Sequence, residues 1–154
     1  MSDDGPDRTL EIDGERFALM EFAFPGPLRD ELIAAVLRGE KTATAGLLSD
    51  FERDGDRIPE PGERQVVVDS ALQPVAILET VEARIIRCGD VDERFARDEG
   101  EGFESVADWR AAHERFWHGY ADEIRAHLGD PEWQVTDDTL IVAERFRLVR
   151  RLDG

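Results

Sequence analysis

Three residues, Lys41, Thr44 and Glu79, have the side-chain types that acyl transfer requires. In that chemistry a carboxylate or an amine takes the proton of a hydroxyl, the hydroxyl oxygen attacks a carbonyl carbon, and an ammonium stabilises the negative charge that develops. Lys41 follows the predicted end of a helix at Gly39, and Thr44 comes three residues later. We expect a local turn to bring Lys41 and Thr44 to one cleft. A solvated lysine beside strand threonines is the common alternative for this spacing.

Two glutamates interrupt the apolar faces of predicted strands. Glu79 falls on such a face in residues 75–86, and Glu144 does so in residues 139–149. A carboxylate that faces a core is costly unless a cation or hydrogen bonds compensate it, and such groups often mark functional sites. Lys41 is the natural partner. A structural ion pair, or a bulge that turns the glutamate outward, is the alternative for each position.

Hydrophobic periodicity predicts the elements that must position these residues. Extended segments are expected at residues 16–24, 41–48, 65–69, 75–86 and 139–149, and the third and fourth of them form a hairpin. Helices are expected at residues 28–38, at about 90–98 and at 105–128. Asp90 is the predicted N-cap of the second helix, and Ser105 is that of the third. Gly119 can break the third helix. Residues 51–62 are predicted to form a loop that overhangs the site. This order predicts an α+β fold with a small curled mixed sheet or open barrel and helices packed on it, and disfavours a doubly wound parallel sheet.

Composition limits the class of partner. The 154 residues fit one domain, and 36 acidic against 19 basic residues give a formal net charge of −17. Tight binding of duplex DNA is therefore excluded, because phosphate contacts require basic surfaces, whereas one nucleoside or splayed base in a local pocket is compatible. The acidic N-terminus lacks a signal-peptide pattern, and no apolar run spans a membrane. We expect a cytoplasmic protein without membrane contact; its oligomeric state is left open.

Residues of the predicted helices offer further, less specific candidates. His113 lies on an apolar helix face, where a satisfied core histidine is commoner than a base, and Trp109 can either stack on a nucleobase or fill the core. The three histidines lack a metal-ligand spacing, and Cys88 is the only cysteine, so no metal and no cofactor are expected. A divalent metal near Glu99 and Glu101 is conceivable, but a solvated helix end is favoured there.

An ordered set of motifs resembles the ASCH domain family, in its longer bacterial branch. The opening residues 22–26, the helix that follows them and the Gly-x-Lys-x-x-Thr signature at residues 39–44 are similar to the start of that domain. The similarity continues through Pro61-Gly62-Glu63, the strand around Glu79, Glu99-Gly100-Glu101-Gly102, Trp109-Arg110 with His113, and Val142-Ala143-Glu144-Arg145-Phe146. It covers residues 16–150, so we expect a partly disordered tail at residues 1–15 and a single ASCH domain at residues 16–154.

The resemblance implies a PUA-like open β-barrel with a cleft for RNA or a modified nucleoside. Some similar proteins hydrolyse cytidine acylated on its exocyclic amine, and others are linked to RNA cleavage, so the resemblance implies a hydrolase. The amidohydrolase pattern maps onto Lys41 and Thr44 and, by strand position, onto Glu79 as catalytic residues. Expected substrate-binding residues are Gly39, Thr42, Trp109, His113 and Glu144. We expect Lys41→Ala to abolish turnover at a nearly unchanged melting temperature. A non-catalytic nucleotide-binding module, or a translation-associated one, is the alternative.

Overall fold

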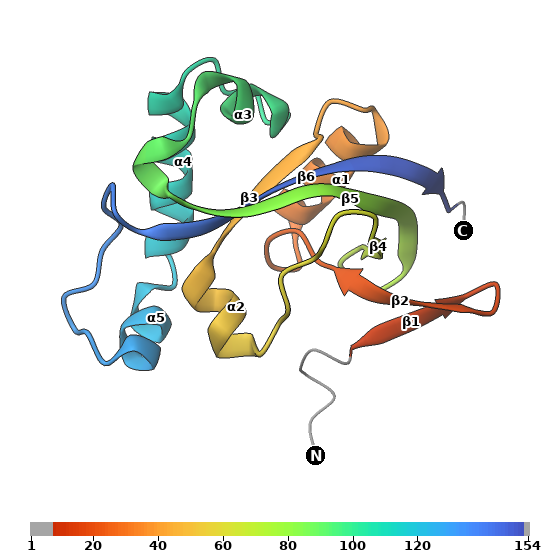
Figure 1. Cartoon of the computed structure of the whole chain (residues 1–154), viewed down its shortest axis with the longest axis horizontal. Helices are drawn as coiled ribbons and strands as arrows, with labels where there is room; N and C mark the ends of the chain where they lie inside the picture. Colours follow the sequence, from red (N-terminus) through yellow and green to blue (C-terminus); the bar gives the residue numbers. More distant parts are fainter. Residues whose placement is uncertain (1–7, 153–154) are drawn as a thin grey trace.

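A six-stranded mixed sheet, in the order β1-β2-β4-β5-β6-β3, runs through the molecule (Figure 1). The computed structural model describes residues 8–152. The strands are β1 Thr9–Ile12, β2 Glu15–Met20, β3 Ala43–Leu47, β4 Arg64–Val68, β5 Pro74–Arg87 and β6 Leu140–Arg151. β2 and β4 run parallel, and the other neighbouring pairs run antiparallel. Because β1 and β3 remain edge strands, the sheet is open, which confirms the predicted α+β fold.

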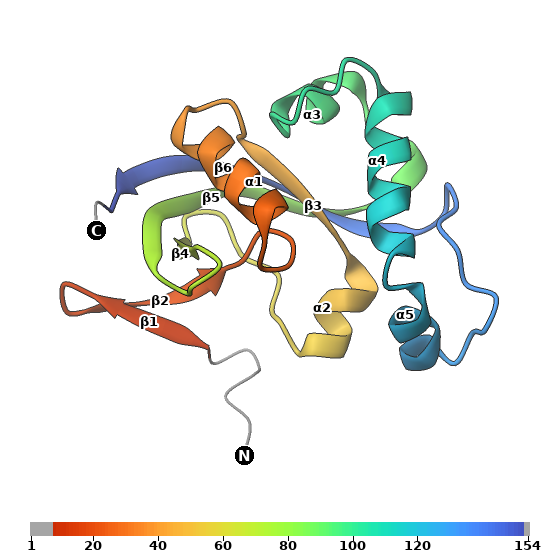
Figure 2. The ribbon, with the colours of Figure 1, turned by 180° about the vertical axis from the view of Figure 1, so that it is seen from behind.

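Helices pack on this sheet in two groups. Within residues 8–152 they are α1 Pro27–Leu37, α2 Leu48–Asp54, the 3-10 turn η1 Cys88–Asp90, α3 Glu93–Asp98, α4 Val106–His118 and α5 Ala121–Leu128. Leu32, Ile33 and Val36 of α1 share one apolar cluster with Phe146 of β6. Aromatic residues of α3 and α4 share another with β3 and β6. Figure 2 shows α1 and α4 in front of the central strands.

The ends of the helices confirm most of the capping predictions. Pro27 opens α1, and Ser105 Oγ accepts a hydrogen bond from the Asp108 N–H at 3.1 Å at the start of α4. α4 ends at His118, where the break at Gly119 was expected. The prediction that Asp90 caps α3 is wrong. Asp90 belongs to η1, and Asp92 caps α3 instead. No helix within residues 8–152 is long and apolar enough to cross a membrane.

Two segments that were expected to be irregular contain regular structure. Leu10 and Ile12 of β1 pack beside Phe17 of β2, and this apolar contact orders residues that were assigned to the disordered tail. Residues 1–7 lie outside the described part of the chain. The predicted loop at residues 51–62 is helical in its first part, because α2 extends to Asp54 and the ring of Phe51 lies over Gly46 of β3.

β5 departs from strict alternation at irregularities in its pairing with β6. The register shifts between Ile77 and Leu78 and again between Thr80 and Glu82. As a result Thr80 is buried, whereas Val81 is 52% exposed, which is the reverse of the predicted pattern. A bulge inserts one residue and thereby changes which side chains face the core. This shift decides the environment of Glu79.

Candidate functional site

Two segments from distant parts of the chain meet backbone to backbone beside β3. Residues 39–42 follow α1, and residues 98–101 comprise the last residue of α3 and the turn after it. The Thr42 N–H donates to the Asp98 carbonyl oxygen at 2.8 Å. Gly100 lies so close to Glu40 that a Cβ atom on Gly100 would be 2.4 Å from the Glu40 carbonyl oxygen, and its φ is +68°. Only glycine fits this contact, which brings the acids of residues 99–101 to Lys41.

Lys41 is buried at this junction, with 2% of its surface exposed. Its Nζ donates to the carbonyl oxygens of Ala43 at 2.9 Å and Glu99 at 3.3 Å. Two carboxylate oxygens complete the surroundings, Glu101 Oε2 at 3.2 Å and Glu99 Oε1 at 3.5 Å. The ammonium also lies 5.5 Å from the centre of the Phe22 ring. The ammonium is therefore desolvated and held in one place.

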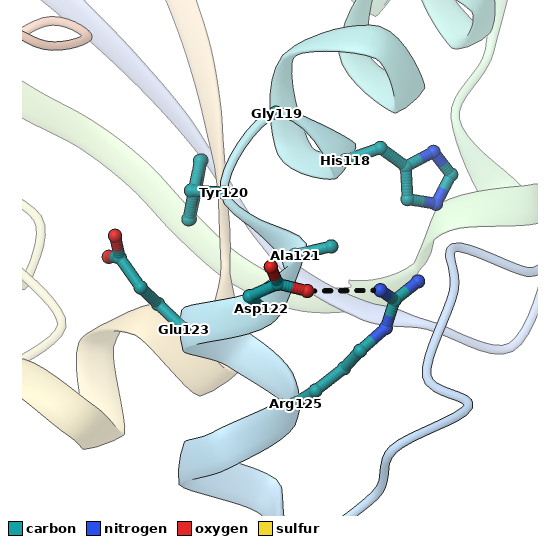
Figure 3. A pocket seen from close by; sticks show the side chains of 7 residues that line it. All are labelled: His118, Gly119, Tyr120, Ala121, Asp122, Glu123 and Arg125. Carbon is teal, nitrogen blue, oxygen red and sulfur yellow. Dashed lines mark hydrogen bonds and ion pairs between the residues drawn. The ribbon is translucent and has the colours of Figure 1, made fainter.

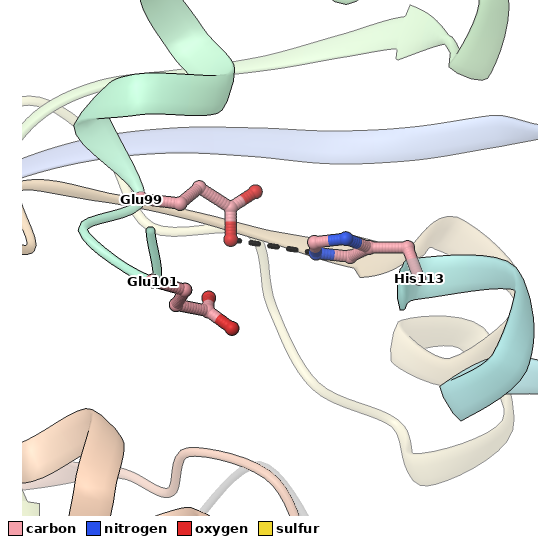
Figure 4. A group of neighbouring side chains, drawn as sticks. All are labelled: Glu99, Glu101 and His113. Atoms are coloured by element: carbon pink, nitrogen blue, oxygen red, sulfur yellow. Dashed lines mark ion pairs between the residues drawn. The ribbon is translucent and has the colours of Figure 1, made fainter. Parts of the chain in front are cut away.

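Glu99 is the fully buried anion of the site, with 1% of its surface exposed. The Trp109 Nε1–H donates to Oε2 at 2.6 Å, and His113 Nε2 lies 3.4 Å from Oε1 (Figure 4). Burial by itself would raise the pKa of Glu99, but Lys41, His113 and Trp109 together outweigh burial and lower this pKa to about 2. Glu99 is therefore ionised throughout the neutral range.

Glu101 has the opposite tendency, although it shares the same cation. Burial and the neighbouring negative charge of Glu99 raise the pKa of Glu101 against the opposing effect of Lys41. Its side chain is 22% exposed, whereas that of Glu99 is 1% exposed. Two adjacent carboxyl groups whose pKa values are moved apart are the usual arrangement for a fixed charge beside a proton acceptor. Glu101 is the group of this pair that solvent or a substrate can reach.

His113 is oriented by its own helix. Its Nδ1 lies 2.9 Å from the Trp109 carbonyl oxygen, which only accepts, so Nδ1 carries a hydrogen and donates. Nε2 then faces the Glu99 carboxylate. Burial lowers the pKa of His113, but Glu99 and the Trp109 carbonyl outweigh burial, and the net effect is a raised pKa. Glu99 thus favours protonation of this ring, and a protonated His113 would place a second positive charge beside Glu99.

Glu99, Glu101 and His113 also form the one group within residues 8–152 whose ligand atoms, all within 4.8 Å of one another, could hold a metal ion. The Lys41 ammonium lies 3.5 Å and 3.2 Å from the two carboxylates. A divalent cation would have to tolerate this ammonium or displace it. The electrostatics of the cluster thus favour a lysine that is compensated by acids over a metal centre.

Thr44 and Glu144 face each other on neighbouring strands. They are directly opposite in the antiparallel pair β3–β6, where Cβ atoms are about 5 Å apart. Thr44 is half-buried and Glu144 is 6% exposed. Burial and the charge of Glu63 raise the pKa of Glu144 to about 7, although the positive charge of Lys41 opposes them. The charge of Lys41 therefore reaches Glu144, and Thr44 is the cross-strand neighbour of Glu144.

Glu79 does not join this group. Its carboxylate accepts hydrogen bonds from Arg64 Nε and Arg147 Nη2, each at 3.1 Å, and these two bonds lower its pKa. Both arginine side chains are about half exposed, at 45% and 55%, so this is a surface ion-pair network. The prediction that Glu79 is the ionic partner of Lys41 is therefore corrected. The bulge in β5 turns the Glu79 side chain toward Arg64 and Arg147. Glu99 and Glu101 are the carboxylates beside Lys41 instead.

The remaining predicted binding residues have mainly structural contacts. Trp109 is completely buried and stacks on His113 at 4.2 Å between ring centres, so its faces are occupied by protein. Thr42 Oγ1 donates to the Asp98 carbonyl oxygen at 3.4 Å, and Gly39 closes α1 with a φ of +80°. The acids that the sequence placed at a solvated helix end, Glu99 and Glu101, are the functional candidates that were missed. Their signal was the alternation of acid and glycine over residues 99–102.

Two hollows in the described part of the chain lie away from Lys41, one at residues 118–125 and one at residues 130–139. One of about 250 Å³ lies at the α4–α5 junction and is lined by residues 118–123 and Arg125 (Figure 3). Asp122 and Arg125 form an ion pair across it at 3.4 Å, and both are accessible to solvent. This hollow contains none of the residues around Lys41.

Comparisons with known proteins agree with this architecture. A family model described as the ASCH domain matches residues 20–150. The solved ASCH domain from Lactobacillus crispatus is similar, with 30% identity and a TM-score of 0.73, over 87% of this chain and 80% of that chain. Protein EF3133 from Enterococcus faecalis has 27% identity and a TM-score of 0.71, over 87% of this chain and 77% of that one. A comparison with curated proteins gave no match.

Proposed function

This chain belongs to the ASCH domain family, and we propose that it binds a modified nucleoside or RNA base beside Lys41 and hydrolyses an amide on that base. The observation that carries the proposal is the buried ammonium between two carboxylates whose pKa values are shifted in opposite directions. Such a set contains a fixed positive charge for an oxyanion and a proton acceptor within one site. The nucleoside part of the proposal rests on the family resemblance.

Each residue has a role in this hydrolysis. Glu101 takes a proton from the attacking water, and the water oxygen bonds to the amide carbon. Lys41 and the Thr44 hydroxyl donate hydrogen bonds to the carbonyl oxygen as it becomes negative. The C–N bond then breaks, and Glu101 returns the proton to the leaving amine. Glu99 stays ionised, holds Lys41 in place and is itself held by Trp109 and His113.

Charge favours an amide over a phosphodiester as the bond that is cleaved. A phosphodiester would bring a further negative charge beside Glu99 and Glu101, in a chain whose net charge is −17. The Lys41 ammonium is the cation available at this site, and it already pairs with both Glu99 and Glu101. A neutral amide adds charge only in the transition state, where Lys41 can stabilise it. RNA cleavage is therefore the less favoured reaction at this site.

Glu101→Gln tests the assigned base. With N4-acetylcytidine as substrate, we expect kcat to fall by about 100-fold or more, because the general base is lost, while KM changes little. In the wild type, kcat should rise with pH through the raised pKa of Glu101, since the ionised form is the active one. Release of cytidine, followed by chromatography, measures both quantities. Binding of N4-acetylcytidine without any product would instead favour a non-catalytic module, and cleavage of an RNA oligonucleotide would favour a ribonuclease.

Glu79→Gln is the matched control for that experiment. Glu79 contacts Arg64 and Arg147 at the surface and is therefore expected to contribute little to turnover. We expect kcat and KM for N4-acetylcytidine to stay within about twofold of the wild type. A loss of turnover as large as that of Glu101→Gln would contradict the reassignment of the acid from β5 to the segment after α3.

A further inference from the structure

Phe24, in the segment between β2 and α1, carries an aromatic ring that the core does not enclose. It is the only phenylalanine, tyrosine or tryptophan within residues 8–152 that is more than half exposed, at 55%. Its ring stacks on that of Phe116 in α4, with 5.6 Å between the ring centres and 27° between the planes. Tyr120 meets the Phe24 ring edge-on, at 5.2 Å between centres. Phe116 therefore covers one face of the Phe24 ring, and the other face is left to solvent, where an apolar ring is unfavourable.

The backbone that carries Phe24 is fixed by a buried arginine. Arg29 is 1% exposed. Its Nε donates to the Phe22 carbonyl oxygen at 3.0 Å, and its Nη2 donates to that of Ala23 at 2.9 Å. Ala23 has a left-handed φ of +57°, which a residue with a side chain adopts only at a cost. A buried charge and a strained residue thus hold the Phe24 ring at the surface in a fixed orientation.

Two independent contacts link the Phe24 ring to the proposed reaction centre. Two residues before it, the ring of Phe22 lies 5.5 Å from Lys41 Nζ. On the other side, Phe116 lies three residues after His113 and hence on the same face of α4. His113 belongs to the cluster around that lysine. The exposed ring therefore borders the reaction centre both through the segment before α1 and through α4.

A flat, neutral ligand fits an open aromatic face of this kind. Every nucleobase has a π-face, so stacking on an aromatic side chain is favourable for any of them. A phosphate would need a cation instead. The guanidinium of Arg53 lies 6.0 Å from the centre of the Tyr120 ring, but it already pairs with Asp50 and Asp54. The chemistry beside Phe24 thus favours a base over a phosphate.

We propose that the open face of the Phe24 ring stacks on the base of the substrate. This inference rests on the proposed function, because it concerns the base on which that reaction takes place. Stacking acts equally on the bound substrate and on the transition state, so it lowers KM and leaves kcat unchanged. Phe24 is thus a binding residue, separate from Lys41 and Glu101, which carry out the chemistry.

Cytidine, the product of the proposed reaction, measures base binding without any turnover. Its Kd is determined by calorimetric titration of the wild type, Phe24→Leu and Phe24→Trp. We expect Kd to rise about tenfold in Phe24→Leu, because leucine retains apolar volume but has no π-face. In Phe24→Trp we expect Kd to stay close to that of the wild type or to fall. Cytidine should also quench the fluorescence of the added tryptophan, whereas ribose should not.

Steady-state kinetics with N4-acetylcytidine give a second readout. In Phe24→Leu we expect KM to rise about tenfold while kcat stays within about twofold of the wild type. Leu28→Ala is the matched control, because Leu28 is an exposed apolar residue of α1, at 40%, that has no aromatic ring. We expect Leu28→Ala to leave both the Kd of cytidine and KM close to the wild-type values.

The outcomes separate this inference from the proposed function. If the wild type does not bind cytidine, or if Phe24→Leu binds it as tightly as the wild type, stacking on Phe24 is overturned, whether or not N4-acetylcytidine is hydrolysed. An equal loss of affinity in Leu28→Ala would also overturn it, since apolar surface rather than a ring would then be responsible. If cytidine binding depends on Phe24 but N4-acetylcytidine is not hydrolysed, the stacking stands and the hydrolase function fails. We expect melting temperatures close to that of the wild type, because both side chains are largely exposed.

Discussion

Replacing Lys41 with methionine is expected to abolish turnover and to lower the free energy of unfolding by about 3–5 kcal/mol. The variant removes the charge that does most to lower the pKa of Glu99, so this carboxyl group, which is 1% exposed, must either stay charged with only His113 beside it or take up a proton at a cost to stability. This corrects the expectation from the sequence that loss of Lys41 would leave the melting temperature nearly unchanged, because a buried ion pair behaves differently from a solvated lysine. Urea denaturation followed by tryptophan fluorescence measures the stability, and release of cytidine measures the turnover.

A second substitution distinguishes the electrostatic role of Lys41 from its chemical role. In the double variant Lys41→Met, Glu99→Gln the buried charge is removed together with its partner, and glutamine can still accept the hydrogen bond from Trp109. We expect most of the stability to return, while turnover stays absent because the oxyanion lacks its ammonium. Recovery of turnover in the stable double variant would show that Lys41 has no part in the chemistry.

Gly100→Ala is expected to open the junction that forms the site. An added Cβ would lie 2.4 Å from the Glu40 carbonyl oxygen and 2.6 Å from the Lys41 Cα, both in backbone that cannot turn aside. The left-handed φ of +68° adds about 1–2 kcal/mol of strain to about 1–3 kcal/mol from overpacking. We expect the free energy of unfolding to fall by roughly the sum of both, and turnover to be lost because Glu99 and Glu101 move away from Lys41.

Gly102→Ala is the matched control, two residues away. Gly102 has a similar backbone, with a φ of +87°, but nothing lies within 4 Å of the added Cβ. We expect this variant to show the strain alone, about 1–2 kcal/mol, and to keep most of its turnover. Equal losses in the two alanine variants would contradict the claim that close contact between residues 40–41 and Gly100 holds the site together. Thermal denaturation measures the stability of both variants, and release of cytidine measures their turnover.

The local elements were predictable because their signals are local. Pro27 and Gly39 bound α1, Ser105 caps α4, and the turn between β4 and β5 closes a hairpin. Apolar alternation also located β6. The strand β1 escaped prediction because its few residues become ordered only through contact with β2. The start of α2 was missed because its polar sequence is typical of a loop, whereas the packing of Phe51 on Gly46 supports the helix.

The sequence by itself determined the family and the fold class and singled out Lys41 as a candidate, because these depend on motifs and periodicities within short segments. Only the tertiary structure decided which acids accompany Lys41. A bulge in β5 sends Glu79 to two surface arginines, and the turn at Gly100 carries Glu99 and Glu101 into contact with Lys41, some sixty residues away along the chain. The physical reason is that the ionic partner of a buried charge is fixed by where distant backbones meet, and no short segment of the sequence contains that information.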